Sequence, residues 1–266
     1  MTVAGHLARA VYSEWVKLRR RRFLYGSLIA IVGVVLLSTV VAIAGARRSP
    51  GAHGALTLVA LGEPSGLARG LAGSDILLGA VALAIAAAQF GSEFAHGTLR
   101  NLLVREPRRT VLMAGKCLAV LSFLLVALAV ASTVAIVAAF AAAHLRHVPT
   151  TGWTSGAGMS QLGVAIGDLA ISVSGFAAVG MVLGVLLRSS VVAIATGLAL
   201  LLPVETILVS AIPGTARWLP GQMLSAIAEG GTPSVPFAAA LATVVAYLAV
   251  AIVATMTTFV RRDVTS

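Results

Sequence analysis

Long apolar runs, separated by short polar or glycine- and proline-rich connections, dominate the chain. A helix that crosses a membrane needs about 20 mostly apolar residues. Six runs meet or approach this length, and they cover residues 24–44, 74–91, 111–143, 162–187, 191–211 and 237–260. The pattern predicts an all-α integral membrane protein with one six-span domain over residues 24–260. Small residues in the second and fourth runs, among them Gly175, Gly180 and Gly184, favour close contact between helices in lipid.

The segment before the first run, residues 1–23, has the period of an amphipathic helix. Leu7, Val11, Trp15 and Leu18 fall on one stripe, while Arg9, Ser13 and Arg20 fall on the opposite face. Such a helix can lie in the membrane interface with its tryptophan at headgroup depth, and a plain basic anchor is the alternative. Glu14 borders the apolar stripe and makes the pattern imperfect.

A second amphipathic stretch follows the second run and ends at Pro107. Phe94, Leu99, Leu102 and Leu103 share one face, and Glu93, Gly97 and Arg100 share another. We expect a short helix here, which could dock on lipid, on its own bundle or on a protein partner.

Composition supports the membrane prediction and charge orients it. Of the 266 residues, 59% are hydrophobic and 11% are charged, and the mean hydropathy is +1.00, whereas soluble domains carry roughly 25% charged residues. Fourteen of the 19 lysines and arginines fall in residues 1–23, between the second run and Lys116 at the start of the third, after the fourth run or in the tail 261–266. The positive-inside rule therefore predicts that both termini are cytoplasmic. Because the basic residues cluster at the ends of apolar runs, we do not expect the net charge of +10 to bind nucleic acid.

Catalytic motifs are missing from the sequence. The chain has no Gly-x-x-x-x-Gly-Lys-Ser/Thr phosphate loop, and Gly115-Lys116 is followed by Cys117. No histidine lies inside a predicted span, so a membrane serine protease is disfavoured, and His144 and His147 alone make a weak metal site. We expect no catalytic residue, no metal and no cofactor in this chain.

The stretch from Glu93 to Lys116 nevertheless resembles a known family. Glu93, Gly97-Thr98, Arg100, the leucines, Pro107-Arg108-Arg109 and Lys116 are similar to the type-2 export permeases of ATP-binding cassette (ABC) transporters. Glu14-Trp15-Val16-Lys17-Leu18, Arg188-Ser189-Ser190 and Trp218-Leu219-Pro220 look like the same family. The outer connections depart from some eukaryotic relatives because they are short and carry no cysteine pairs.

The resemblance implies a permease subunit of an exporter in a bacterial plasma (inner) membrane. It would pair with a second permease chain and with two separate ATPase subunits, which would bind ATP and Mg. Its N-terminal stretch would be the connecting helix, with Glu14, Trp15 and Lys17. The ATPases would hold a coupling helix made of Glu93, Phe94, His96, Gly97, Thr98, Arg100 and Asn101. The substrate would be a drug (multidrug efflux), peptide, lipid or glycan; a non-transporting assembly or regulatory subunit and an intramembrane enzyme are the alternatives.

Two acidic residues, Asp168 and Glu205, fall in or near apolar runs toward the predicted outer half. Charge inside a membrane is costly and often functional. They would line a wet outer cavity or contact a cationic group of the substrate, or else be hydrated at the interface or cap a neighbouring helix. Pro203 is expected to break the fifth span beside Glu205.

Overall fold

The computed structural model describes residues 3–46, 57–95 and 109–261, and within these ranges every regular element is a helix. Six helical segments are long and apolar enough to cross a membrane, as predicted: α2, α5, α7, α8, the continuous run from α9 to α10, and α12. The elements are α1 (Val3–Leu18), α2 (Arg21–Ala44), α3 (Leu58–Gly62), α4 (Gly66–Ala72), α5 (Asp75–Ala95), α7 (Arg109–Leu145), α8 (Gly156–Leu187), α9 (Ser190–Ala199), the π-helical turn η1 (Leu200–Val204), α10 (Glu205–Ala211), the 3-10 turn η2 (Thr215–Trp218), α11 (Pro220–Ala228) and α12 (Phe237–Arg261).

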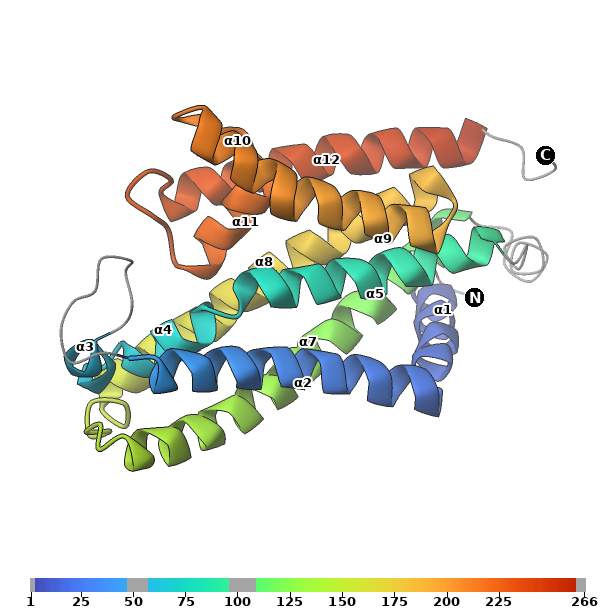
Figure 1. Ribbon diagram of the computed structural model, residues 1–266. Helices are drawn as coiled ribbons and strands as arrows, with labels where there is room; N and C mark the ends of the chain where they lie inside the picture. The colour runs from blue at the N-terminus through green and yellow to red at the C-terminus, as the bar shows by residue number, and fades with distance from the viewer. Residues whose placement is uncertain (1–2, 47–56, 96–108, 262–266) are drawn as a thin grey trace.

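The six long segments run side by side, and α1 lies crosswise at one end of the bundle (Figure 1). The start of α2, the end of α5, the start of α7 and the end of α12 lie at this same end, whereas α3 and α4 lie at the other (Figure 1). The first and last described helices therefore approach the same end of the bundle, as an even number of spans requires.

The centre of the bundle is the contact between α5 and α8, the most extensive between any two described helices. Both helices run in the same direction, and glycine lets their backbones meet. A Cβ atom placed on Gly180 would lie 2.3 Å from the carbonyl oxygen of Leu83, and one on Gly184 would lie 2.9 Å from that of Ala87. The close packing expected from the small residues of the second and fourth spans is thus present.

A second seam joins α2 to α7. Buried residues recur every four positions on α2, at Ser27, Ile31, Val35, Thr39 and Ile43. On α7 the residues at the same spacing are alanines, Ala127, Ala131, Ala135, Ala139 and Ala143, and each is at most 2% exposed. Rows of side chains four residues apart are the ridges that pack helices together.

The connections at the end opposite α1 are tied to the spans by hydrogen bonds. Trp153, which is 1% exposed, donates its indole N–H to the carbonyl oxygen of Leu61 and meets the ring of Phe140 edge-on. Arg146 donates to the carbonyl oxygen of Ala46 at 2.8 Å. These contacts tie α3 and the end of α2 to α7 and to the connection between α7 and α8.

Candidate functional site

Two residues of the predicted coupling helix lie in the described part of the chain, where α5 ends. Glu93 and Phe94 belong to the last turn of α5, which continues to Ala95 rather than stopping at Gly91. The other members of the predicted set lie outside the described residues: His96, Gly97, Thr98, Arg100 and Asn101. The described flanks of this segment are the end of α5 and the start of α7.

The predicted connecting helix is α1, and its irregular residue, Glu14, is buried. Its carboxylate lies 2.5 Å from the Nζ atom of Lys17, one turn along α1, and 3.5 Å from that of Lys116 on α7. Glu14 and Lys116 are each 3% exposed. Buried charges of this kind are stable only when they are paired. Glu14 is tolerated beside the apolar stripe because it faces Lys116, a lysine 102 residues away.

Lys116 also contacts α5, because its Nζ atom lies 5.3 Å from the centre of the Phe90 ring. Trp15, the residue after Glu14, also joins α1 to α7, since its indole N–H donates to the Ser122 hydroxyl at 3.0 Å. We call Glu14, Trp15, Lys17, Phe90 and Lys116 the α1 junction. It joins α1 to both helices that flank residues 96–108.

Backbone packing brings α1 and α7 close enough for these bonds. A Cβ atom on Gly115 would lie 2.6 Å from the Cβ atom of Ala10, so the helices meet at a glycine directly before Lys116. A larger residue at position 115 would push α1 away from α7 and lengthen the contact between Glu14 and Lys116.

Glu205, the first residue of α10, binds the N-terminus of α11. Its carboxylate accepts hydrogen bonds from the backbone N–H groups of Gly221 at 3.0 Å and Gln222 at 2.9 Å, and Glu205 is 3% exposed. A carboxylate at a helix N-terminus satisfies donors that have no partner within the helix and interacts favourably with the helix dipole. Of the roles that the sequence left open for Glu205, this geometry fits the capping of a neighbouring helix.

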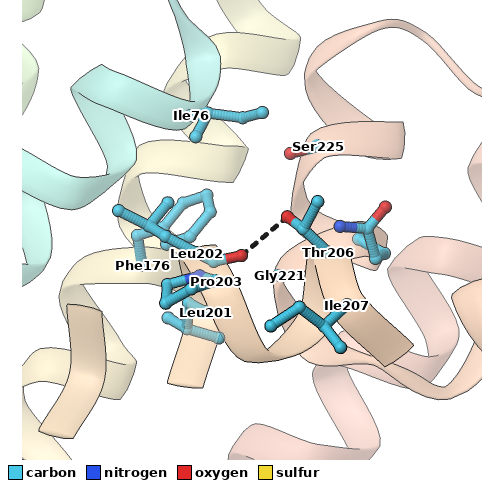
Figure 2. A pocket seen from close by; sticks show the side chains of 10 residues that line it. Ile76, Phe176, Leu201, Leu202, Pro203, Thr206, Ile207, Gly221 and Ser225 are labelled. Carbon is cyan, nitrogen blue, oxygen red and sulfur yellow. Dashed lines mark hydrogen bonds between the residues drawn. The ribbon is translucent and has the colours of Figure 1, made fainter. Parts of the chain in front are cut away.

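Pro203 lies in the π-helical turn η1, which widens the fifth span instead of ending it. The Thr206 hydroxyl donates to the carbonyl oxygen of Leu202 at 2.7 Å, and this bond is drawn in Figure 2. Beside the turn is a mainly apolar cavity of about 440 Å³ between α5, α8, η1, α10 and α11. Its lining includes Ile76, Phe176, Leu201, Leu202, Pro203, Thr206, Ile207, Gly221, Gln222 and Ser225 (Figure 2).

Asp168 is separate from Glu205, and the two predicted residues do not form one site. Asp168 lies on α8, is 9% exposed and lines another cavity of about 330 Å³. A Cβ atom on Gly230, just after α11, would lie 3.5 Å from its carboxylate, whereas Glu205 contacts the first residues of α11. The nine residues of α11 therefore lie between the two acids.

A family model described as "Protein of unknown function (DUF2705)" matches residues 73–265, more than two thirds of the chain. The chain belongs to the DUF2705 family. No curated protein matches the sequence. The match includes α5 and every helix after it, but α1 and α2 precede it, so the α1 junction joins a segment before the matched region of this DUF2705 protein to residues within it.

Asp75 and Glu229, two acids that were not singled out as site residues, lie close to each other, and Glu229 lines the same cavity as Asp168. Asp75, the first residue of α5, is 6% exposed; it interacts with the Ser225 hydroxyl, and its Oδ2 atom has no described partner. Loss of hydration and the nearby Asp75 carboxylate raise the pKa of Glu229. The one sign of this acidic pair in the sequence was the position of Asp75 at the start of the second apolar run. No group of three or more His, Cys, Asp or Glu residues within the described ranges is arranged to hold a metal ion.

Proposed function

We propose that this DUF2705 chain is the membrane-spanning permease subunit of an ABC exporter, driven by separate ATPase subunits and paired with a second permease chain. The observation that carries the proposal is the α1 junction. It brings together the two strings that resemble type-2 export permeases, around Glu14 and around Lys116, and it does so through buried charges.

The position of the junction suits a coupling element. Phe90 lies five residues before the end of α5, and Lys116 lies seven residues after the start of α7. Both helices flank residues 96–108, where the ATPases would bind, and both contact α1 through Lys116. A displacement of that segment would therefore move α1, α5 and α7 together instead of bending one helix alone.

The charge pattern gives the orientation. Helix α1 and the starts of α2 and α7, all of which carry basic residues, lie at the end of the bundle that carries the junction. The positive-inside rule assigns this end to the cytoplasm, where ATP is available. The chain has no phosphate loop of its own, so the energy for transport comes from the partner subunits.

The test is recovery of the ATPase. A tagged chain is purified in mild detergent from the cells that produce it, and copurifying ATPase subunits and ATP hydrolysis are measured. Glu93→Arg and Gly97→Trp should remove both signals without lowering the amount of membrane-inserted chain. Glu63→Arg is the control, because Glu63 has a side chain 53% exposed and lies before α4, at the other end of the bundle.

Failure to recover an ATPase with the unaltered chain would contradict the proposal. Equal recovery with Glu93→Arg, Gly97→Trp and Glu63→Arg would instead contradict the assignment of the coupling helix.

A further inference from the structure

A cavity of about 330 Å³ lies at the end of the bundle opposite the α1 junction, between α4, α8 and the end of α11. Its polar lining consists of Ser65, Arg69, Ser160, Gln161, Asp168 and Glu229. The remaining lining residues are small and apolar, namely Ala68, Ala72, Val164, Ala165, Ala228 and Gly230. The cavity thus combines a polar part with a surface suited to a hydrocarbon chain.

Asp168 is a buried carboxylate in the lining of this cavity. It is 91% buried, since its exposed fraction is 9%, and it lines the cavity. Within the described ranges its carboxylate has neither a hydrogen-bond donor nor a cation beside it. Burying an ionised carboxylate without a partner is costly, and a cation in the cavity would remove that cost.

The balance of charge around the cavity is negative. Glu229 lies at the rim, and Asp75 lies close enough to raise the pKa of Glu229. Arg69 is the cation of the lining, but it lies 3.9 Å from Glu63. The carboxylates of Asp168 and Glu229 therefore face the cavity, whereas the charge of Arg69 is shared with Glu63.

The lining also selects between kinds of cation. None of its described residues is aromatic, so a quaternary ammonium would lack the ring faces on which such groups are bound. A primary ammonium has three N–H donors, which the two carboxylates, the Gln161 carbonyl and the serine hydroxyls can accept. The absence of a three-ligand cluster in the described residues argues against a metal ion.

We propose that this cavity binds the primary ammonium group of an amphiphile, with Asp168 as its ionic partner, Glu229 as a second acceptor at the rim, and the alanines against the alkyl chain. The ammonium can belong to a free amine or to the headgroup of a lipid such as phosphatidylethanolamine. The inference concerns binding by this chain alone and does not depend on the proposed ATPase partners.

The test uses the purified full-length chain in nanodiscs of phosphatidylglycerol, which has no amine. Octylamine and octyltrimethylammonium are titrated and binding is followed by calorimetry. We expect octylamine to bind at least about tenfold more tightly, because an ammonium–carboxylate hydrogen bond is among the strong polar contacts. Equal affinities would overturn the proposal, and this comparison requires no altered protein.

Three variants locate the site. Asp168→Asn should lower octylamine affinity by about tenfold or more and Glu229→Gln by a smaller factor, because the rim is more hydrated. Asp263→Asn, which removes a carboxylate from the tail 261–266 instead, should leave it unchanged. Unchanged affinity in Asp168→Asn would place any bound amine elsewhere and overturn the proposal.

Lipid sources are distinguished by native mass spectrometry in nanodiscs with phosphatidylethanolamine or phosphatidylcholine, which carries a quaternary ammonium. Retention of phosphatidylethanolamine alone, reduced by Asp168→Asn, identifies a lipid headgroup. Binding of octylamine without lipid retention identifies a free amine. Neither result appearing would overturn the proposal.

Acidification provides an independent readout. Glu229 faces Asp75, Asp168 and Arg69, and its raised pKa means that it takes up a proton at a higher pH than an exposed glutamate does. Octylamine stays protonated throughout the acidic range, as a lysine does, so its affinity should fall as the pH is lowered. In Glu229→Gln this fall should be smaller, because the carboxylate that takes up the proton is gone, and an unchanged pH dependence would overturn the role of Glu229 as second acceptor.

Discussion

The contact between α5 and α8 can be tested at a single atom. In Gly180→Ala the added Cβ would lie 2.3 Å from the carbonyl oxygen of Leu83 and 3.0 Å from two further backbone atoms of that residue. Ordinary van der Waals contact begins near 3.4 Å, so the helices must separate locally by roughly 1 Å. The atoms in the way are backbone, which cannot rotate aside as a side chain can.

The cost follows from two opposing terms. Overpacking a close helix contact costs about 1–3 kcal/mol, and alanine favours the helix over glycine by about 1 kcal/mol. The neighbouring contacts of the two helices are also tight, since a Cβ on Gly184 would lie 2.9 Å from the Ala87 carbonyl oxygen and one on Gly79 would lie 2.4 Å from the Phe176 ring. We expect a net loss of about 1–2 kcal/mol of stability.

Gly167→Ala is the matched control on the same helix, because a Cβ atom at Gly167 would meet nothing within 4 Å. It should be neutral or stabilising by up to about 1 kcal/mol. Thermal unfolding of both variants in the same detergent measures the difference, which is expected to be roughly 3–10 °C in Tm. Equal Tm values would refute the account of α5 and α8 as a glycine-mediated backbone contact.

Three further predictions concern the polar contacts. In a double-mutant cycle of Glu14→Gln and Lys116→Gln, thermal unfolding should give a coupling energy of about 1–3 kcal/mol, and strictly additive losses would show that the two charges do not interact. Glu205→Gln should lower stability by about 1–2 kcal/mol, since one of two cap hydrogen bonds is lost; unchanged unfolding would remove Glu205 from the capping role. Trp15→Phe keeps the ring but loses the bond to Ser122, so we expect a loss of about 1 kcal/mol and faster proteolysis within α1, and wild-type proteolysis would contradict this.

The sequence predicted what depends on local pattern. Six spans follow from apolar length, and the close packing of α8 follows from Gly180 and Gly184. Glu14 was visible only as an irregularity, because its partner Lys116 is 102 residues away and no helical period connects them. Pro203 was expected to break the fifth span, but a proline can also be accommodated by a π turn, as it is in η1.

The roles of buried acids were less predictable, because a carboxylate in an apolar run has the same signature whether it caps a helix or faces a cavity. Glu205 differs from Asp168 only through Gly221 and Gln222, whose N–H groups reach it from another helix. The pKa of Glu229 is likewise raised by burial and by the carboxylate of Asp75, which the fold brings near it from the start of α5. Helix packing, rather than spacing along the chain, decides these roles.

The two proposed sites lie at opposite ends of the closely packed helices α5 and α8. Asp75 begins α5 near the ammonium cavity, Phe90 lies near its other end in the α1 junction, and α8, which carries Asp168, is held against α5 between them. Each site can still be removed separately, because neither includes the contact at Gly180. Asp168→Asn should leave ATPase recovery unchanged, and Glu93→Arg should leave octylamine affinity of the purified chain unchanged. Loss of both properties in either variant would mean that the substitution disrupts the helix pair itself, which the Tm of that variant would reveal.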